Sequence, residues 1–284
     1  MSGAPEGILG QIIALTREEL SARKRELSEG ALAKRLAEAG QRPDARPPHG
    51  ALRSALAAGQ LALIAEIKRR APSAGALRSE LDAGALAAAY ARSGASALSV
   101  LTERAHFGGS LADLEAARGA CALPLLRKDF IIDPYQLLEA RVAGADAVLL
   151  IVAALSDREL CALLEEARAL GLDALVEVHD RAQLDRALCA GAAIIGINNR
   201  DLRDFSVDLT RTHQLLSAVP AQALIVSESG IESAQQLLEL REAGVHGALI
   251  GSALMRAGDP ARALAQLVAA LERTPAPGAQ PRSL

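Results

Sequence analysis

The stretches LALIAEIK (61–68), LPLLRKDF (123–130) and LVEVH (175–179) each consist of a short apolar run that ends in charged side chains. Parallel strands that are buried on both faces have such continuous apolar sequences. A charged group at the end of an apolar strand costs free energy to desolvate unless it is paired. In α/β proteins the chemistry lies at the C-terminal ends of the strands. The first candidates for an active site are therefore Glu66, Lys68, Lys128 and Glu177.

From residue 61 onward, short apolar runs alternate with longer amphipathic segments. In each of eight units a strand is followed by a predicted helix, and these helices connect one strand to the next, which indicates parallel strands joined by βαβ crossovers. Eight such units match an α/β fold of the (β/α)8 TIM barrel type. No G-x-G-x-x-G fingerprint follows the first run, which argues against a doubly wound sheet. The predicted strands are 61–66, 95–101, 123–128, 146–151, 173–178, 193–197, 223–227 and 247–251. The predicted helices between and after them are 83–93, 110–120, 134–143, 156–170, 181–190, 208–218, 231–242 and 259–273.

The segment before the first strand is predicted to be helical. Apolar residues recur at near-helical spacing over 8–38, a turn-rich stretch covers 40–50, and a short helix follows from Ala51. The barrel is therefore expected to carry an extra N-terminal helical segment that packs on it. The expected domains are an extension over 1–60, the catalytic barrel over 61–273 and a disordered tail over 274–284.

Composition excludes several classes of function. Half of the 284 residues are apolar and the net charge is −3, which gives no electrostatic case for nucleic acid or an anionic membrane as partner. No apolar stretch reaches the ~20 residues of a membrane span, and the N-terminus lacks a secretory signal. The three cysteines and five histidines have no metal-ligand or disulfide spacing, which favours buried, reduced thiols. We expect a cytoplasmic protein without a metal.

Further polar groups follow the predicted strands at positions that share a face with the first candidates. Side chains two residues apart on a strand point the same way, so Asn198 and Arg200 of GINNR share a face, and His179 lies on the side of Glu177. Any one of these groups alone is equally consistent with a structural ion pair at the barrel rim. Together they indicate a functional site, because charges with perturbed pKa values gather at such sites. A supporting hydrogen bond is the expected role of His179.

The last two predicted strands end in SESGI (227–231) and LIGSALM (249–255), where small residues precede a predicted helix. Backbone N–H groups at a helix N-terminus bind anions, and the loops after strands 7 and 8 are the usual phosphate site of such barrels. The alternative is that the glycines only serve tight turns. Two serine-bearing turns on adjacent strands favour phosphate. The predicted phosphate-binding residues are Gly230, Gly251 and Ser252.

Phe107 and Phe130 fall just beyond the second and third predicted strands. In a chain whose core is aliphatic, this placement predicts a flat ligand ring held between them. Such packing adds about 0.5–1.5 kcal/mol per aromatic pair beyond burial. For Phe107 a loop residue that folds onto the barrel rim stays the alternative.

Several motifs, in order from about residue 60 to residue 256, resemble the indole-3-glycerol phosphate synthase family: IAEIKRRAPSAG, LTERAHFGGS, LPLLRKDFIIDPYQ, GADAVLLIVAAL, LVEVH, IGINNRDL, VSESGI and LIGSALM. The resemblance implies a cofactor-free carboxy-lyase of tryptophan biosynthesis. The implied substrate is 1-(2-carboxyphenylamino)-1-deoxyribulose 5-phosphate. The implied products are indole-3-glycerol phosphate, carbon dioxide and water. A monomer is expected.

The resemblance also implies residue roles. Lys128 of RKDF matches the general acid that protonates the ketone, and Glu177 of LVEVH matches the general base for the later dehydration. Glu66 and Lys68 assist them, and Lys68 is also placed to pair with phosphate or carboxylate. The implied substrate-binding residues are Asn198, Arg200, Glu228, Ser229, Phe107 and Phe130. The implied phosphate-binding residues are again Gly230, Gly251 and Ser252.

Two questions stay open at the level of sequence. The direction in which the pKa of Lys128 shifts is one, because nearby cations lower it and nearby carboxylates raise it. The other is the effect of the first loop, where 71–75 read A-P-S-A-G and the family usually has S-P-S-K-G. The change touches neither the proposed acid nor the proposed base.

Three alternative functions are consistent with parts of the pattern. In a class I aldolase, Lys128 would form a Schiff base with a sugar-phosphate ketone. Phosphoribosylanthranilate isomerase would need a Cys/Asp pair, whereas the first strand here carries Glu66 and Lys68. A catalytically inactive barrel would bind a phosphate ligand without turnover.

Overall fold

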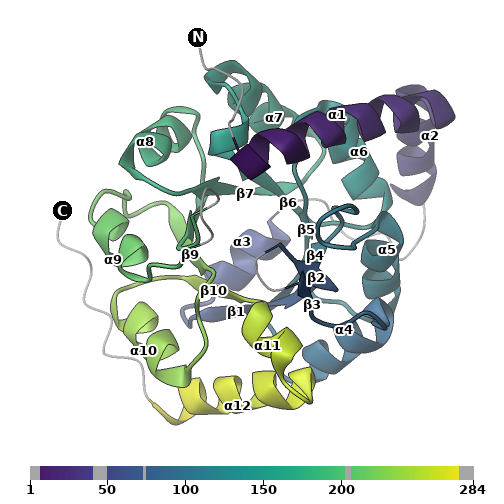
Figure 1. Cartoon of the computed structure of the whole chain (residues 1–284). Helices are drawn as coiled ribbons and strands as arrows, with labels where there is room; N and C mark the ends of the chain where they lie inside the picture. Colours follow the sequence, from purple (N-terminus) through teal and green to yellow (C-terminus); the bar gives the residue numbers. More distant parts are fainter. Residues whose placement is uncertain (1–6, 41–49, 73–74, 202–205, 275–284) are drawn as a thin grey trace.

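Eight parallel strands close into a barrel in the order β1-β10-β9-β8-β7-β6-β5-β4 in the computed structural model, which describes residues 7–40, 50–72, 75–201 and 206–274. Helices surround the strands (Figure 1). This confirms the predicted (β/α)8 TIM barrel with an N-terminal helical segment. The strands are β1 (Ala62–Ile67), β4 (Ala97–Leu101), β5 (Leu125–Lys128), β6 (Ala147–Ile151), β7 (Asp173–Val178), β8 (Ile194–Asn198), β9 (Leu224–Glu228) and β10 (Gly247–Ile250).

The outer helices begin where short polar side chains can cap them. In seven of the eight, an Asp or Ser immediately before the helix accepts a hydrogen bond from a backbone N–H of the first turn, and α9 is the exception. These caps determine where each βα loop ends. The helices are α4 (Ala83–Arg92), α5 (Leu111–Ala120), α6 (Pro134–Val142), α7 (Asp157–Ala169), α8 (Arg181–Cys189), α9 (Thr210–Leu216), α10 (Ala234–Glu242) and α12 (Pro260–Arg273).

Four small elements lie at the C-terminal ends of strands. The two-residue strands β2 (Arg70–Ala71) and β3 (Gly75–Ala76) pair within the first βα loop. The 3-10 helix η1 (Val152–Ala154) follows β6, and the five-residue helix α11 (Ser252–Arg256) follows β10. The apolar patterns did not predict them, because they are too short to show a period.

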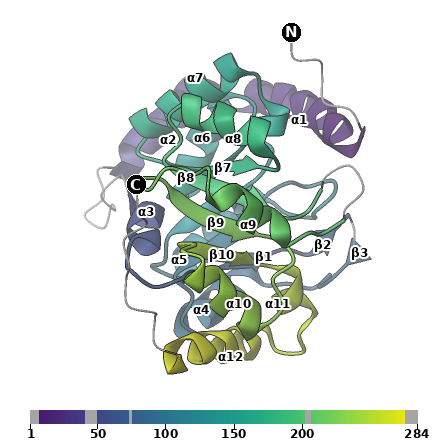
Figure 2. The ribbon, with the colours of Figure 1, turned by 90° about the vertical axis from the view of Figure 1, so that its left-hand side faces the viewer.

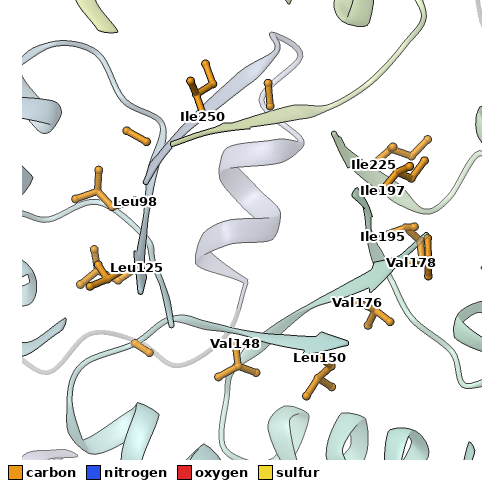
Figure 3. Close-up of a cluster of buried hydrophobic side chains, with 14 of the residues drawn as sticks. Leu98, Leu125, Val148, Leu150, Val176, Val178, Ile195, Ile197, Ile225 and Ile250 are labelled. Carbon is orange, nitrogen blue, oxygen red and sulfur yellow. The ribbon is translucent and has the colours of Figure 1, made fainter. Parts of the chain in front are cut away.

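Strand residues alternate between two apolar environments. Those that point outward pack against the helices, and Figure 3 shows the labelled ones directed away from the barrel interior. Each such buried Val, Leu or Ile stabilises the fold by about 1.5–3 kcal/mol relative to an exposed one. The outward residues in Figure 3 are Leu98, Leu125, Val148, Leu150, Val176, Val178, Ile195, Ile197, Ile225 and Ile250.

The inward positions change from apolar to charged along the strands. Ile64, Leu126, Leu175 and Val226 belong to the interior apolar cluster. Two residues further along the same strands, and therefore on the same face, come carboxylates and an ammonium. The residues at these next inward positions are Glu66, Lys128, Glu177 and Glu228. The barrel is therefore apolar at its N-terminal end and charged at its C-terminal end.

Helix α3 (Ala51–Leu56) closes the N-terminal end of the barrel. Leu52 and Leu56 are buried in the interior cluster, and Leu56 Cδ2 occupies the space where a Cβ on Gly247 would lie. The Arg53 backbone N–H donates a 3.0 Å hydrogen bond to Asp173 Oδ2 at the start of β7. Figure 2 shows α3 at the end of the barrel opposite to β2 and β3. Within the part of the chain that the structure describes, α3 covers the N-terminal opening, and ligands reach the interior from the C-terminal end.

The single helix predicted over 8–38 is wrong, because the structure has α1 (Gly7–Glu26) and α2 (Glu29–Gly40) with a break between them. Ser28 Oγ accepts from the Ala31 N–H and so caps α2. The Tyr135 hydroxyl lies 3.2 Å from the Arg23 carbonyl and 2.7 Å from the Leu27 carbonyl, at the end of α1. A side chain from α6 therefore stabilises the helix end.

Helices α1 and α2 pack on different parts of the barrel. Leu9, Ile12 and Ile13 of α1 join the interior cluster together with Phe130, which places α1 beside the C-terminal ends of β5 and β6. Helix α2 packs on α6, where Leu32 contacts a cluster that includes Tyr135. The N-terminal segment thus supports Phe130 beside the charged end of the barrel.

Some predictions fall outside the described residues or are corrected by them. Most of the turn-rich stretch, residues 41–49, and most of the tail, residues 275–284, lie outside the described chain, as do residues 73–74 of the first loop. The thiols of Cys161 and Cys189 are exposed, so the expectation that all three cysteines are buried is wrong. Among the described helices, none is long and apolar enough to span a membrane.

Candidate active site

A cavity of about 360 Å³ opens at the C-terminal end of the barrel. It brings together twelve of the thirteen predicted site residues, from loops and strands all around the barrel. The thirteenth, Glu228, is fully buried directly below the cavity, where it contacts Lys128. The predicted residues on the cavity surface are Glu66, Lys68, Phe107, Lys128, Phe130, Glu177, Asn198, Arg200, Ser229, Gly230, Gly251 and Ser252.

Two lysines and two carboxylates form the floor of the cavity, and a third carboxylate, Glu228, lies beneath them. Lys128 Nζ lies 2.5 Å from Glu228 Oε2 and 3.7 Å from Glu177 Oε2. Lys68 Nζ contacts Glu66 Oε1. All five side chains are at most 15 % exposed. These charges come from β1, β5, β7 and β9 and meet because the barrel closes.

The surrounding charges decide the state of Lys128. Burial lowers the pKa of this ammonium, but Glu228, Glu177 and Glu66 together outweigh burial and raise its pKa above the ordinary lysine value. The question left open by the sequence is thereby answered. Burial raises the pKa of the Glu66 carboxyl, but Lys68 and the other nearby cations lower it by more. The pKa of Glu66 therefore lies below its ordinary value. Both groups are therefore charged at neutral pH.

Glu228 has the opposite balance. Burial raises the pKa of this carboxyl to about 7, and Glu177 adds to the rise while Lys128 opposes it. Glu228 Oε1 is buried without a hydrogen-bond partner. It occupies the space beside Gly196 of β8, where a Cβ would lie 2.1 Å from it. The Glu228 carboxyl therefore titrates near neutral pH, while Lys128 beside it stays protonated.

Replacing Gly196 with alanine is expected to displace Glu228 from Lys128, because the new methyl group would overlap Glu228 Oε1. Breaking this 2.5 Å contact should lower kcat by about tenfold, or about 1.4 kcal/mol in activation free energy. Steady-state kinetics checks this, with Gly119→Ala as the control, since a Cβ at Gly119 meets nothing within 4 Å. Unchanged kcat in Gly196→Ala would show that Glu228 need not contact Lys128.

Asn198 and Arg200 form another wall of the cavity. Asn198 Oδ1 accepts a 3.0 Å hydrogen bond from the Arg200 backbone N–H, which ties the two residues together. Burial lowers the pKa of Arg200, and Glu66 opposes this effect. The guanidinium is therefore held within the electrostatic field of the lysines and carboxylates, where it can bind an anionic group of a ligand.

Sequence reasoning missed Asn199, which lies between these two residues and points away from the cavity. Its Nδ2 donates to Ser227 Oγ, the Glu228 carbonyl and the Ser229 carbonyl at 3.0–3.1 Å. These bonds fix the end of β9 and hence the loop that follows Glu228. Its place between Asn198 and Arg200 is the signal that could have found it, because alternation turns it to the opposite face of the strand, where a polar side chain needs hydrogen-bond partners.

The predicted phosphate-binding residues are placed differently in their two loops. Gly251 directly precedes Ser252, the first residue of α11, as expected. Helix α10, however, begins at Ala234 and not at residue 231, so Gly230 lies in a loop and not at a helix N-terminus. There Ser229 and Gly230 both have left-handed backbone conformations, with φ of 67° and 80°. Both loops still line the same part of the cavity.

The two phenylalanine rings form one side of the cavity. Their centroids are 6.3 Å apart and their planes are tilted by 39°, so the rings contact each other. The predicted ligand ring between them has no room in this arrangement. Glu103, which sequence reasoning missed, holds the loop of Phe107 by accepting 2.8 Å hydrogen bonds from the His106 and Phe107 backbone N–H groups.

The described part of the chain contains no group of three or more His, Cys, Asp or Glu side chains arranged to hold a metal ion. The chemistry available from the cavity residues is proton transfer and charge stabilisation by lysines and carboxylates. An anion can bind beside the glycine loops, and an apolar group can pack on the phenylalanines.

The profile of the family described as Indole-3-glycerol phosphate synthase matches residues 9–267. The chain belongs to the indole-3-glycerol phosphate synthase family. It is 47 % identical over 266 residues to an indole-3-glycerol phosphate synthase of Paracidovorax citrulli, which covers 92 % of this chain and 99 % of that protein. An indole-3-glycerol phosphate synthase of Acidithiobacillus ferrooxidans is 50 % identical over 260 residues, with coverage of 92 % and 98 %.

Solved structures of other proteins share the fold. Thiamine phosphate pyrophosphorylase from Pyrococcus furiosus is similar with a TM-score of 0.57 at 21 % identity, covering 78 % of this chain and 98 % of that one. KGPDC from Streptococcus mutans has a TM-score of 0.58 at 16 % identity, with coverage of 75 % and 99 %. At these identities only the barrel is shared. The motifs that resemble indole-3-glycerol phosphate synthase surround one cavity within it.

Proposed function

We propose that this protein is an indole-3-glycerol phosphate synthase of tryptophan biosynthesis. It converts 1-(2-carboxyphenylamino)-1-deoxyribulose 5-phosphate to indole-3-glycerol phosphate, carbon dioxide and water. Within the family already identified, the observation that carries this proposal is the position of Lys128. Its ammonium lies in the cavity among three carboxylates that raise its pKa, so it is protonated when a substrate arrives.

Ring closure needs a proton donor at the ketone oxygen. The aryl carbon that bears the carboxylate forms a bond to the ketone carbon, and the ketone oxygen takes a proton from Lys128 Nζ. The carboxylate then leaves as carbon dioxide, and its bonding electrons restore the aromatic ring. Lys128 must leave its 2.5 Å contact with Glu228 to reach the oxygen. The raised pKa of Glu228, about 7, lowers the free-energy cost of leaving this buried carboxyl without its cation while Lys128 is at the oxygen.

Dehydration needs an acid and a base on the same intermediate. The hydroxyl group leaves as water after it gains a proton, and a base removes a proton from the neighbouring carbon to form the double bond of the pyrrole ring. Glu177 is the base, because its carboxylate lines the cavity beside Lys128. Glu66 and Lys68 form an ion pair that lies across the barrel from Glu177. The pair assists by balancing charge and by delivering protons.

The remaining cavity residues bind the substrate. Gly230, Gly251 and Ser252 present backbone groups to the phosphate, with Lys68 close to this loop, since a Cβ on Gly251 would lie 2.9 Å from Lys68 Nζ. Arg200, together with Asn198, orients the aryl carboxylate. Ser229 and the buried Glu228 support this end of the cavity, and the side formed by Phe107 and Phe130 packs on the anthranilate ring.

The charge state of Lys128 also separates this function from that of a class I aldolase. A lysine that forms a Schiff base reacts as the neutral amine and is activated by a lowered pKa. The carboxylates around Lys128 raise its pKa instead. Acid catalysis fits this environment, and covalent catalysis does not. Borohydride added with substrate should therefore leave the mass of Lys128 unchanged.

The proposal is tested by incubating the purified protein with the anthranilate-derived ribulose phosphate and following the fluorescence of the indole product. Repeated turnover is expected without added metal or cofactor. Substrate binding without turnover would favour the inactive phosphate-binding barrel. A mass increase on Lys128 after borohydride treatment would favour the aldolase.

Replacing Glu177 with glutamine is expected to slow dehydration by about a hundredfold or more while changing substrate affinity little, because the amide cannot accept the proton. Single-turnover experiments that separate carbon dioxide release from indole formation check this. Release of carbon dioxide should continue while the hydroxylated intermediate accumulates. An unchanged rate of indole formation would assign the base to another carboxylate.

We further propose that the protein acts as a cytoplasmic monomer on this small molecule, without a nucleic-acid partner. The net charge of −3 supports the last point, because such a chain has no electrostatic attraction for phosphodiester backbones. Light scattering of the purified protein tests the monomer, and a mass twice that of the 29.5 kDa chain would contradict it.

A further inference from the structure

His179 lies behind the proposed base and away from the substrate. It follows β7 directly, two residues after Glu177, so both side chains lie on one side of the strand. His179 Nε2 is 3.6 Å from Glu177 Oε1, and the imidazole is only 11 % exposed. Glu177 lines the cavity and His179 does not. Any effect of this histidine on the reaction must therefore pass through Glu177.

The hydrogen bonds of Gln183, in α8, identify which ring nitrogen of His179 carries the proton. The His179 backbone N–H lies 3.0 Å from one terminal atom of the Gln183 amide, and this identifies that atom as the oxygen. The other end of the amide donates a 3.3 Å hydrogen bond to Asp180 Oδ2, which fixes the same orientation. His179 Nδ1 lies 3.3 Å from the Gln183 oxygen, so Nδ1 carries the proton.

The unprotonated nitrogen then faces a carboxylate. In this tautomer the neutral imidazole has a lone pair on Nε2, which is buried and has no hydrogen-bond partner. Opposite it stands Glu177 Oε1, which also offers only lone pairs when ionised. Two acceptors at this distance cannot bond each other. One additional proton placed between them would satisfy both, as Nε2–H on the histidine or O–H on the glutamate.

We propose that His179 is a positioning residue that holds, on Nε2, the proton that Glu177 removes from the substrate. This inference rests on the proposed function. In dehydration the substrate carbon loses a proton to Glu177 and the hydroxyl leaves as water. The proton on Glu177 then passes to His179 Nε2, which becomes an imidazolium with Nδ1–H still bonded to Gln183. Glu177 is thereby returned to its ionised form, and the imidazolium releases its proton to solvent before the next turnover.

The groups around this pair agree with such a transfer. Lys128 of β5 lies 3.7 Å from the other Glu177 oxygen, and Glu228 of β9 is in contact with Lys128. Asp180, before α8, reaches the imidazole through Gln183. Helix η1, which packs against β7 and α8, carries only Val and Ala side chains. A positive charge on the imidazole is therefore balanced by Glu177 and Asp180.

The first experiment measures kcat against pH for four variants of the full-length protein. His179→Asn should lower kcat by about tenfold to a hundredfold with unchanged KM, which is a smaller loss than for replacement of the base, Glu177. It should also remove one ionisation from the acidic side of the plot of kcat against pH. Gln183→Glu places a carboxylate on Nδ1 and should shift that limb to higher pH. The double variant should show no such shift. The control is His213→Asn, an exposed histidine of α9, which should behave as the unmodified protein.

The second experiment needs no substrate and therefore separates this inference from the proposed function. Nitrogen-15 NMR of the resting protein should show the Nδ1–H form of His179, and Gln183→Leu should give a mixture of the two tautomers. A retained kcat and an unchanged pH profile in His179→Asn, in a protein that makes indole, would overturn the inference alone. An Nε2–H tautomer in the unmodified protein would overturn it as well. Absence of indole formation in the unmodified protein would refute the proposed function.

Discussion

Replacing Lys128 with methionine is expected to abolish formation of the indole ring, with kcat at least about a thousandfold lower, because the ketone oxygen then has no proton donor. The protein should remain folded. Without Lys128, nothing opposes the burial that already raises the pKa of Glu228 to about 7, so this carboxyl becomes neutral and is not itself left as an unpaired buried charge. Product fluorescence and circular dichroism measure the two effects.

An exposed lysine provides the matched control for this substitution. Lys34 of α2 is 80 % exposed, and its ion pair with Glu38 is 4.0 Å long. Lys34→Met should leave both kcat and the unfolding midpoint unchanged. Substantial turnover in Lys128→Met would remove Lys128 from the acid role and direct attention to Lys68, the other ammonium of the cavity floor.

Replacing Arg127 with methionine is expected to lower the free energy of unfolding by about 3–5 kcal/mol. Arg127 is adjacent to Lys128 but points outward, beneath α6, and is 1 % exposed. Its guanidinium lies 2.8 Å from Asp129 Oδ2 and 3.3 Å from Glu139 Oε2, and it donates a 2.7 Å hydrogen bond to the Gln136 carbonyl. Methionine would leave these buried acceptors without their cation. Urea unfolding followed by circular dichroism measures the loss.

Two further variants show whether the loss comes from buried charge. Arg181→Met removes an exposed arginine whose 2.8 Å ion pair with Asp185 lies in solvent, and it should change stability by less than about 1 kcal/mol. Asp129→Asn added to Arg127→Met should recover part of the loss, because it removes one of the unpaired carboxylates. A fully stable Arg127→Met protein would mean that the cluster contributes no net stability.

The same cluster links the N-terminal segment to the loop that follows Lys128. Arg23 of α1 lies 2.9 Å from Glu139, which is one partner of Arg127. Gln136 accepts from the Ile132 N–H and donates to the Phe130 carbonyl, so it holds the backbone of this loop. The backbone at Phe130 is therefore held by Gln136 of α6, and the same helix is tied to α1 through Glu139 and Arg23.

Most of the barrel could be predicted from local pattern. A strand has a period of two, so an apolar run that ends in a charge, such as LALIAEIK, indicates both a buried strand and the face on which its last polar residue lies. Alternation accounts for the strand-end residues that line the cavity, such as Glu66, Lys128 and Glu177, whereas the loop residues followed from their place after the strands or from the family resemblance. The start of α10 was predicted at residue 231 but lies at Ala234. A helix start depends on its cap, here Ser233, and not on the apolar period.

Other features had no local signal. The break between α1 and α2 involves the Tyr135 hydroxyl, which comes from a helix more than a hundred residues later. The contact between the two phenylalanine rings depends on how the loops after β4 and β5 meet. The need for glycine at position 196 arises from Glu228, which belongs to the neighbouring strand.

The sequence by itself determined the barrel, its charged end and the residues that gather there, because these follow from alternation along each strand and from parallel wiring. Only the tertiary structure decided the protonation of Lys128 and Glu228 and the tautomer of His179. These depend on burial and on charges and hydrogen bonds across the barrel, such as the contact between Lys128 and Glu228, which are 100 residues apart. Electrostatic energy depends on distance in space and on solvent exclusion, and neither is encoded in local spacing.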